Sequence, residues 1–524
     1  MTDQLVLAFD MGTQSIRALL INPKGDILCK AQKAFEPVYY STAPGRAEQK
    51  PAVYWDALVE TSRALKAKAG GLWNNVIAVT LATIRETCVC LGENNEPVRD
   101  AIVWVDDRTV DTKDLPPLPV GIQVILKLSR LSALVEMQRK KSHCNWIAVY
   151  QPDIWKKTKT YTFISTWLNY KLTGVLADSY AGMIGHMPYD NKLRSWMKSS
   201  DLRRMVFALD NGRLCPLVAP GDTLGTITAE ASGQMGIAQG LPLIATGSDK
   251  GCETLGVSCL SSEKAAISFG TTATVQVSTK TWFEPVPNMP AYTAIAPGYY
   301  NPEIQIYRGY WLLSWFKREF AVKEIMQAES LGISAEQLLD KRLQEIPPGC
   351  DGLILQPYFT SSPDMLHARG VAAGLSGAHT RIHLYRAIIE GINFALLQGL
   401  ETLQQRGGLR ITKIFVAGGG SQSDEICRIT ASQFGLPVYR TQTYEACGIG
   451  EAMAAFVSKG IFSSYEQAVS EMVHVKDEFL PDKNACAIYR ELYERIFLKL
   501  FARLSPLYEE IDSIIKCRNQ SGGQ

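Results

Sequence analysis

A β-rich run, a short turn of Gly and Thr, and a second β-rich run occur twice in this chain of 524 residues. The first copy is LAFDMGTQSIRALLI at residues 7–21, and the second is KAAISFGTTATVQVS at residues 264–278. Two matching turns so far apart indicate a repeated design rather than two chance loops. Because one hydrophobic core rarely serves so long a chain, we expect two domains, residues 1–247 and residues 248–524.

Helix and strand patterns alternate after each repeat. PAVYWDALVETSRALKAKAG at 51–70 has helical spacing, and NNVIAVTLA at 74–82 returns to strand character. A helix is expected to end at Gly174, and another covers 381–407 with its apolar residues at helical spacing. This alternation predicts an α/β fold with mixed sheets flanked by helices.

Composition favours a small-molecule partner. The chain has 54 basic and 52 acidic residues, and neither sign forms a block typical of nucleic-acid or membrane binding. The N-terminus has no basic segment before its apolar run, and no uninterrupted apolar stretch of about 18 residues follows, so we expect a soluble, cytoplasmic protein. Twelve scattered cysteines, with Cys88 and Cys90 the closest pair, predict reduced thiols and no structural metal.

The first turn admits two interpretations. Gly, Thr, Ser and Asp occur in any tight β-turn, because they tolerate unusual backbone angles or bond their own main chain. The turn can instead bind phosphate through backbone N–H groups and small hydroxyls, while Asp10 at the strand end holds a magnesium-bound water.

A triple glycine, Gly418–Gly420, follows a predicted strand and precedes a helix whose start carries Ser421 and Asp424 at capping-box spacing. A backbone without side chains lets a flat ring or a phosphate approach closely, and a helix N-terminus adds partial positive charge. The spacing matches neither the dinucleotide fingerprint nor a Walker loop.

Taken in order, DMGTQSIR, GSDKG, FGTTATV and VAGGGSQSD resemble the FGGY carbohydrate kinases, within the sugar kinase, heat-shock ATPase and actin superfamily. The likeness runs from about residue 4 to about residue 460, and GVAAGLSGAHTRIHLYRAIIE at 370–390 is close to a family signature. Ala372 departs from the bulky apolar residue usual there. The resemblance implies two actin-like, ribonuclease H-like ATPase domains with a cleft between them, the first binding the sugar and the second the adenine nucleotide.

The resemblance also implies ATP and Mg²⁺ as cofactors. Asp10 would orient Mg²⁺ through water, and Asp249 would accept the proton of the attacking hydroxyl. The residues implied for nucleotide binding are Gly12, Thr13, Gln14, Ser15, Arg17, Gly270, Thr271, Thr272, Gly418, Gly419, Gly420 and Ser421.

The stretch ATIRETCVCLGENNEPVRDAIVWVDDRT at 82–109 resembles the glycerol kinase branch, in which an Arg-Glu pair and a Trp line the polyol site. Here these residues are Arg85, Glu86 and Trp104, and a surface Arg-Glu pair after a strand is the alternative. Lys250 stands where glycerol kinases carry Gln, and xylulose kinases carry Met-His in place of the Arg-Glu pair. Autoinducer-2 kinases also have Arg-Glu, and LLSWFKREFAVKEIMQAESLGISAEQLL at 312–339 resembles them.

We therefore expect an enzyme that transfers the γ-phosphate of ATP to a hydroxyl of a small polyol or ketose, with Asp249 and Lys250 beside the acceptor. An autoinducer-2 type ligand is the alternative substrate, and an actin-like or chaperone-like ATPase switch is the alternative function. The predicted acceptor residues together with Asp249 favour the kinase. A homodimer is expected from the family.

Overall fold

The computed structural model describes residues 4–129, 131–360, 365 and 367–521. Its described residues form two compact units. The first comprises Met1–Gly256, Tyr292–Tyr300 and Cys447–Val473, and the second comprises Val257–Ala291, Asn301–Ala446 and His474–Gln524. Two later segments of the chain thus pack with the first unit. The predicted domain boundary between residues 247 and 248 stays a prediction.

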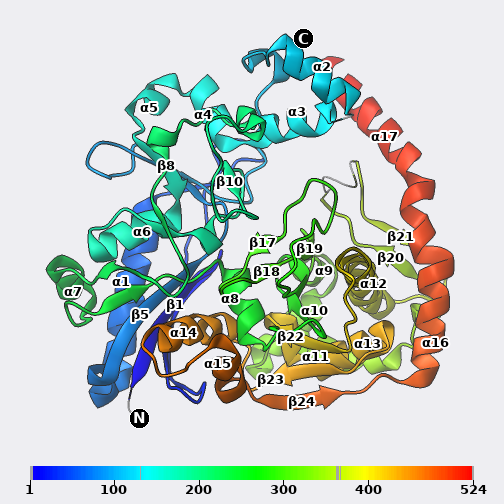
Figure 1. Ribbon diagram of the computed structural model, residues 1–524. Coiled ribbons are helices and arrows are strands. Elements are labelled where there is room, and N and C mark those ends of the chain that lie inside the picture. Colours follow the sequence, from blue (N-terminus) through cyan, green and yellow to red (C-terminus); the bar gives the residue numbers. More distant parts are fainter. Residues whose placement is uncertain (1–3, 130, 361–364, 366, 522–524) are drawn as a thin grey trace. The chain divides into compact units, whose positions relative to one another are not determined.

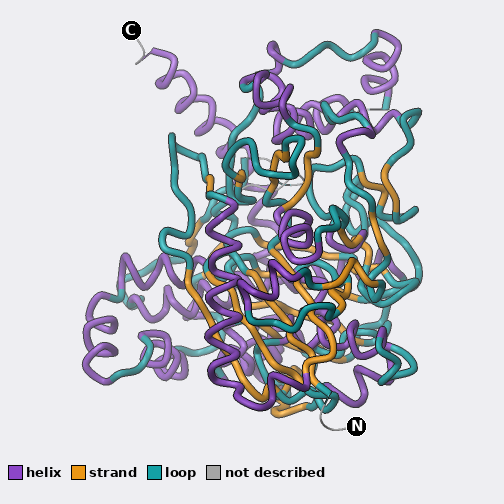
Figure 2. The backbone as a smooth tube through the Cα atoms, turned by 90° about the vertical axis from the view of Figure 1, so that its left-hand side faces the viewer, coloured by secondary structure: helices purple, strands orange, loops and turns teal. Residues whose placement is uncertain are grey.

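The first unit is built on a six-stranded sheet. The central strand β1 is antiparallel to β2 and parallel to β5, so the predicted strand–turn–strand lies at the middle of the sheet. In spatial order the strands are β13 (Thr223–Thr226), β14 (Pro242–Ile244), β5 (Val76–Thr83), β1 (Leu5–Met11), β2 (Ser15–Ile21) and β3 (Ile27–Ala34). Figure 2 shows strands running side by side with helices packed around them.

The side chains of β1 alternate between two faces of the sheet that have different environments. Alternate residues point to opposite faces of a sheet, and Leu5, Leu7 and Phe9 join the core formed with α1 (Pro51–Ala69) and α6 (Ile164–Thr173). Asp10 therefore points to the other face, which α8 (Asp249–Gly256) and α14 (Ala446–Ser458) cover. On that face α14 approaches β2 closely, because a Cβ on Gly448 would lie 2.3 Å from Leu19.

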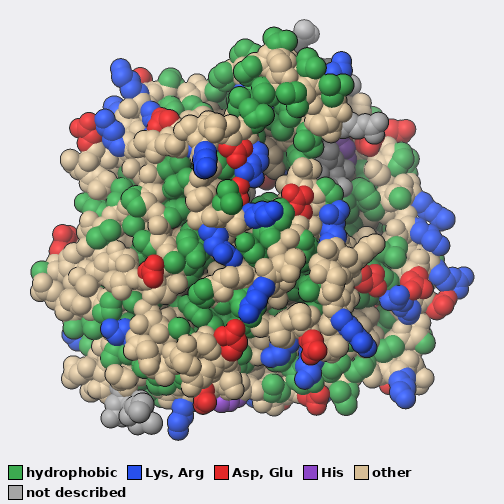
Figure 3. Space-filling model, in the orientation of Figure 1, with side chains coloured by type: hydrophobic (Ala, Val, Ile, Leu, Met, Phe, Trp, Pro, Cys, Tyr) green, Lys and Arg blue, Asp and Glu red, His purple; other side chains and the backbone are tan. Residues whose placement is uncertain are grey.

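Further elements complete the first unit. A four-stranded sheet is formed by β4 (Glu48–Gln49), β7 (Ala101–Ile102), β6 (Cys88–Leu91) and β8 (Thr160–Phe163). The remaining helices are α2 (Val120–Leu128), α3 (Ser132–Lys141), α4 (His143–Tyr150), α5 (Pro152–Lys157), α7 (Ala229–Met235) and α15 (Tyr465–Met472). Cys88 and Cys90 are buried and free, as predicted. Helix α2 is apolar yet exposed, with Val120, Val124, Ile125 and Leu128 facing solvent. Hydrophobic side chains gather over this helix at the top of Figure 3.

The second unit repeats the same sheet. Its strands β15 and β16 form the second predicted strand–turn–strand, and β15 is parallel to β22 on its other side. In spatial order the strands are β19 (Glu303–Ile306), β16 (Ala273–Val277), β15 (Lys264–Phe269), β22 (Lys413–Ala417), β23 (Val438–Thr441) and β24 (Val475–Phe479). Along each sheet, two antiparallel strand pairs are followed by two parallel pairs and then by one antiparallel pair at the edge. In Figure 1, β1 and β5 of the first sheet are blue, and β22, β23 and β24 of the second are yellow to orange.

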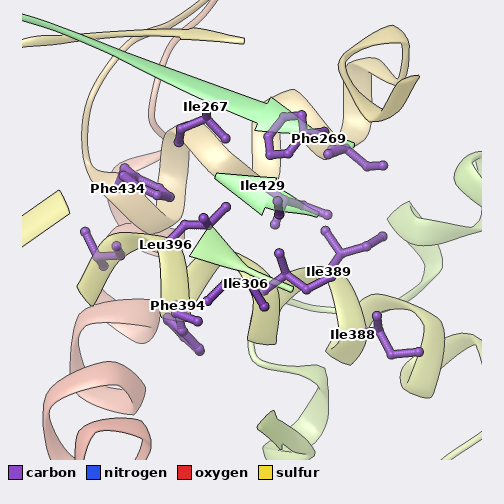
Figure 4. Close-up of a cluster of buried hydrophobic side chains, with 14 of the residues drawn as sticks. Ile267, Phe269, Ile306, Ile388, Ile389, Phe394, Leu396, Ile429 and Phe434 are labelled. Carbon is purple, nitrogen blue, oxygen red and sulfur yellow. The ribbon is translucent and has the colours of Figure 1, made fainter. Parts of the chain in front are cut away.

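Helix α12 (Arg381–Gly407) forms the core of the second unit, as its apolar spacing predicts. Ile388, Ile389 and Leu396 of this helix belong to the same buried cluster as Phe269 of β15 (Figure 4). Gly391 lets it approach β20 (Ile354–Gln356), because a Cβ there would lie 2.2 Å from the carbonyl oxygen of Leu355. His383 belongs to the helix start, since its Nδ1 accepts from the backbone N–H of Thr380.

The other helices of the second unit surround this core. They are α9 (Trp311–Phe320), α10 (Val322–Leu331), α11 (Ala335–Arg342), α13 (Asp424–Phe434), α16 (Lys483–Leu492) and α17 (Leu498–Ser521), with a π-helical turn at Tyr493–Phe497. Small two-stranded sheets are formed by β10 (Tyr189–Asp190) and β11 (Ser195–Trp196), β9 (Asp178–Ser179) and β12 (Leu217–Val218), β17 (Tyr292–Thr293) and β18 (Tyr300–Asn301), and β20 (Ile354–Gln356) and β21 (Val371–Ala373). Within the described part of the chain, no helix combines the length and apolarity that a membrane span requires.

Candidate active site

Three parallel strands of the first unit end at one edge of its sheet. The backbone N–H of Ile84, just after β5, donates to the carbonyl of Met11 at the end of β1 over 2.9 Å. Thr83 forms a parallel bridge with Ser248, which follows β14. In open α/β sheets, ligands bind beyond the carboxyl ends of parallel strands, so residues following these strands are candidates for a shared site.

Asp10 and Arg17 face each other across the first turn. They are direct partners in the antiparallel register of β1 and β2, and Arg17 Nη1 lies 3.0 Å from Asp10 Oδ2. The Asp10 side chain is only 9% exposed. The turn between them is tight, since the N–H of Gly12 donates to the carbonyl of Ser15 over 3.0 Å. The predicted phosphate loop therefore carries a fixed carboxylate at its base.

Asp249 is the first residue of α8 and lies in a crowded charged environment. Burial raises the pKa of its carboxyl to about 6, against the opposing effect of Arg85 and Lys250, while the charge of Asp10 adds to the rise. Arg85 Nε lies 4.0 Å from Asp249 Oδ1, and the backbone N–H of Lys250 donates to the same oxygen. A carboxylate that titrates near neutrality suits proton transfer at physiological pH.

Arg85 is held by contacts from two other segments. Its Nε donates to Ser248 Oγ over 3.1 Å, and its guanidinium lies 5.1 Å from the ring centre of Tyr292. Lys250 extends its ammonium to Glu253, 3.1 Å away and one helical turn on. The predicted acceptor residues Arg85 and Lys250 thus flank Asp249 within one unit.

Glu86 adopts a left-handed backbone conformation, with φ of 57°. Non-glycine residues adopt this region infrequently, and they do so most often at functional sites and turns. Its carboxylate accepts hydrogen bonds from the backbone N–H of His186, at 3.1 Å, and from the ring Nδ1 of the same residue. Sequence reasoning missed His186, because it lies 100 positions away along the chain and belongs to no motif.

Trp104 joins the predicted acceptor residues to the phosphate loop, since its Nε1–H donates to Thr13 Oγ1 over 2.9 Å. The segment that carries Trp104 is held in place by a cluster of buried charged side chains. Arg108 donates to Asp106 and Glu48 at 2.7 and 2.6 Å, and its guanidinium lies 4.5 Å from the ring centre of Trp146. This cluster fixes the backbone immediately after the indole.

In the second unit, the Gly-Thr-Thr turn is braced by the start of α9. The carbonyl of Gly270 accepts from the N–H of Tyr310 over 3.1 Å, and that of Thr271 accepts from the N–H of Trp311. Thr272 Oγ1 donates to the carbonyl of Tyr307. The backbone of this turn is therefore held before any ligand binds.

The triple-glycine turn packs against the end of β15. Gly418 has φ of 78°, and a Cβ there would lie 2.9 Å from the backbone carbon of Phe269. A Cβ on Gly420 would lie 2.4 Å from the ring of Tyr310, whereas one on Gly419 would meet nothing within 4 Å. Close packing on two sides with open space between them leaves room for a flat group at Gly419.

The predicted capping box at this turn is wrong. Ser421 lies in a 3-10 turn, and its hydroxyl donates to the carbonyl of Gly418, so it stabilises the turn itself. Ser423 caps α13 by accepting from the N–H of Ile426. The helix begins two residues later than predicted, because the turn continues through Gln422. The spacing of Ser and Asp residues in the sequence does not reveal this shift. Arg440, also missed, donates to the carbonyls of Ser421 and Gln422.

The structure thus brings the predicted residues together in two groups. The group in the first unit consists of Asp10, Gly12, Thr13, Gln14, Ser15, Arg17, Arg85, Glu86, Trp104, Asp249 and Lys250. The group in the second unit consists of Gly270, Thr271, Thr272, Gly418, Gly419, Gly420 and Ser421. Ser15 is tied to the neighbouring strand, because its hydroxyl accepts from Gln32.

Two family models match this chain, one for each of its halves. The model of the FGGY family of carbohydrate kinases, N-terminal domain, matches residues 5–256, and the model of the C-terminal domain matches residues 265–459. The chain is 27% identical over 508 residues to the uncharacterized sugar kinase YgcE of Escherichia coli strain K12, which covers 95% of this chain and 94% of that protein. It is 28% identical over 516 residues to the autoinducer-2 kinase of Salmonella paratyphi B, covering 94% and 93%.

A solved structure has the same fold. The crystal structure of xylulose kinase from Rhodospirillum rubrum superposes with a TM-score of 0.79 at 23% identity, over 97% of this chain and all of that one. The two family models together match most of the chain, and the solved structure has the same fold over nearly all of it. The chain therefore belongs to the FGGY family of carbohydrate kinases, with its two-domain actin-like ATPase fold, and is a sugar kinase.

Proposed function

We propose that this kinase transfers the γ-phosphate of ATP to a hydroxyl of a small polyol or ketose, with Asp249 as general base. The observation that carries the proposal is the setting of Asp249, a partly buried carboxylate, 25% exposed, with a pKa of about 6 beside Arg85 and Lys250. A base with this pKa is ionised at neutral pH and can still accept a proton as the hydroxyl attacks.

The neighbouring residues would bind and orient the acceptor. Arg85 can donate to hydroxyl or carbonyl oxygens, and Oε2 of Glu86 can accept from hydroxyls. Trp104 offers an apolar ring for the carbon chain while its N–H stays bonded to Thr13. These contacts position one hydroxyl next to Asp249, which supplies most of what phosphoryl transfer requires from a protein.

Mg²⁺ fits the residues around the first turn. In nucleotide sites this ion is held by one or two carboxylates, with water and phosphate oxygens completing its shell. Asp10 supplies one fixed, largely buried carboxylate at the base of the turn. When bound, the ion would neutralise charge that develops on the transferring phosphoryl group.

The turns of the two units would bind ATP. Arg17 and the backbone of Gly12–Ser15 suit phosphate oxygens, because they combine a cation with a tight turn. Gly419, with open space above its Cα, suits the flat adenine or ribose. Ser421 contributes by holding the triple-glycine turn, and its hydroxyl is already engaged there.

The test is ADP release from magnesium-ATP with glycerol, erythritol, pentitols, xylulose, ribulose and the autoinducer-2 precursor as acceptors, and with none. A strong signal from one acceptor class over the no-acceptor control is the expected result. Equal ADP release in every reaction would contradict the proposal. It would indicate an ATPase that hydrolyses ATP to change conformation and phosphorylates no sugar.

A further inference from the structure

A third segment of the second unit reaches the Gly-Thr-Thr turn. Strand β19 is antiparallel to β16, which is itself antiparallel to β15, so β19 and β15 run in the same direction. Ile306 at the end of β19 pairs with Ala273, which pairs with Phe269 at the end of β15. Tyr307 and Arg308, which follow β19, therefore lie at the same edge of the sheet as the turn.

The backbone on both sides of Arg308 is held against this turn. The carbonyl of Tyr307 accepts from Thr272 Oγ1 over 3.1 Å, and a Cβ on Gly309 would lie 2.4 Å from the backbone nitrogen of Ala273. The N–H groups of the two residues after Gly309 donate to carbonyls of the turn. The side chain of Arg308 thus starts from a fixed point beside the turn.

The guanidinium of Arg308 is held in one orientation. Its Nε donates to Thr360 Oγ1 over 3.3 Å, and its central carbon lies 4.8 Å from the ring centre of Trp311. A bond at Nε and a stack on an indole fix the plane of the guanidinium. Among the described residues, Nη1 and Nη2 have no hydrogen-bond partner and the side chain has no carboxylate partner.

Arg308 differs in this respect from Arg440, which lies near the end of β23 at the same edge of the sheet. Arg440 donates to the carboxylates of Asp477 and Asp424 at 2.7 and 2.8 Å, and also to two backbone carbonyls. The charge of Arg440 is therefore compensated by side chains of its own unit. Arg308 instead presents its charge and two NH₂ groups to whatever binds at the turn.

The two units bring a cation to their turns in different ways. In the first unit Arg17 follows the turn on β2 and lies 3.0 Å from Asp10. The corresponding pair of the second unit is Ser268 and Thr274, so neither strand beside the second turn supplies a charge there. Arg308 comes from the next strand of the sheet. An anion at the second turn would therefore meet a cation with no competing carboxylate.

Phosphate suits this arrangement better than a neutral ligand does. The two terminal nitrogens of a guanidinium match two oxygens of one phosphate, and charge-assisted bonds of this kind are about twice as strong as neutral ones. Arg308 is partly buried, and a cation withdrawn from water without a counter-charge is costly. A phosphate at the turn removes that cost, whereas a sugar hydroxyl or an aromatic base does so less well.

We propose that Arg308 binds the phosphate chain of the nucleotide through Nη1 and Nη2. This inference rests on the proposed function and adds a residue to its nucleotide site. The ligand class is a nucleoside diphosphate or triphosphate, and the contact is with phosphate rather than with the base or the ribose.

Calorimetry with adenosine, ADP and ATP isolates this contact. Arg308→Gln keeps a polar side chain but removes the charge and the paired NH₂ groups. We expect it to weaken the binding of ADP and ATP by about 10- to 100-fold and that of adenosine by no more than about twofold. Unchanged binding of ADP and ATP would overturn the inference. So would an equal loss for adenosine, because Arg308 would then support only the shape of the pocket.

The salt dependence of ADP affinity is a second readout, which a purely structural role would not change. At constant magnesium, ADP affinity should fall less steeply with salt in Arg308→Gln than in the unaltered protein, because one screened ion pair is lost. Arg308→Lys keeps the charge without the planar fork, so it should retain the steeper dependence and only part of the affinity. Equal salt dependence in Arg308→Gln and the unaltered protein contradicts the inference.

Arg318→Gln is the matched control. Arg318 lies on α9 in the same unit, its side chain is 62% exposed and it pairs with Glu319, so we expect its loss to leave nucleotide binding unchanged.

The outcomes separate the inference from the proposed function. If ADP binding depends on Arg308 while no acceptor stimulates ADP release, the kinase proposal fails and the inference stands. If an acceptor is phosphorylated while Arg308→Gln binds ADP and ATP as tightly as the unaltered protein, the inference fails and the kinase stands.

Discussion

The two central sheets have the same strand order but place different chemistry at equivalent positions. Two residues before the glycine of the turn, β1 carries Asp10 and β15 carries Ser268. Across the turn Asp10 faces Arg17, and Ser268 faces Thr274. The first unit thus places an ion pair where the second places two neutral hydroxyls.

The same contrast extends to the strands beside them. In the first unit the segments after β5 and β14 carry Arg85, Glu86 and Asp249, whereas in the second the segment after β22 is three glycines. The same sheet topology therefore supports a site of charged side chains in the first unit and a site of glycine backbone in the second. The sheet determines where a ligand binds, and the residues at its edge determine which chemistry the ligand meets.

The largest expected effect comes from removing the base of the charged unit. Asp249→Asn keeps the shape of the side chain but cannot accept the proton, so we expect kcat/KM to fall by about 10²- to 10⁴-fold. Steady-state kinetics measures the loss, and calorimetry with ATP should show nucleotide binding little changed. Retained turnover would remove Asp249 from the mechanism and weaken the contrast between the units.

The next effect tests the buried charges that support Trp104. Arg108→Met leaves Asp106 without its cation in a buried place, while Glu48 keeps its ion pair with Arg99, and we expect the free energy of unfolding to fall by about 3–5 kcal/mol. Denaturant unfolding measures the change. Arg203→Met, at a 58% exposed arginine that pairs with Asp190 and Asp201, is the matched control and should cost far less.

The triple-glycine turn of the second unit should be sensitive to added side-chain volume rather than to a change of charge. Gly420→Ala places a Cβ against the ring of Tyr310, and we expect a loss of about 1–3 kcal/mol together with weaker ATP binding. Gly419→Ala is the control for stability, since its Cβ meets no protein atom, yet it should still weaken ATP binding if the nucleotide lies there. Thermal unfolding and calorimetry distinguish the two effects.

The smallest expected effect concerns the stability cost of the charged site. Burial raises the pKa of Asp249 to about 6 in the folded protein, against about 4 when unfolded, so its ionisation lowers stability as pH rises from about 4 to about 6. Asp249→Asn should therefore increase the free energy of unfolding by about 1–2 kcal/mol at pH 8 and by little at pH 4. A gain in the free energy of unfolding that does not depend on pH would show that the amide does not act by removing the ionisation of Asp249.

Much of the fold follows from local pattern. The helix at 381–407, the C-terminal Gly174 of α6 and the two strand–turn–strand units all form as predicted. These features depend on neighbouring residues, because helical and strand periodicity and turn chemistry act over a few positions. The helix start after the triple glycine was misplaced for the same reason, since either serine could cap and only the packed turn selects Ser423.

The family, the repeated sheet, and the turns and carboxylates that follow the central strands can all be read from the amino-acid sequence. The tertiary structure, by contrast, sets the contact of His186 with Glu86 and the packing of Cys447–Val473 with the first unit. It also decided that Trp104 bonds to Thr13. Periodicity and turn chemistry record interactions between near neighbours, whereas contacts across 100 residues depend on how whole elements pack, which no local pattern encodes.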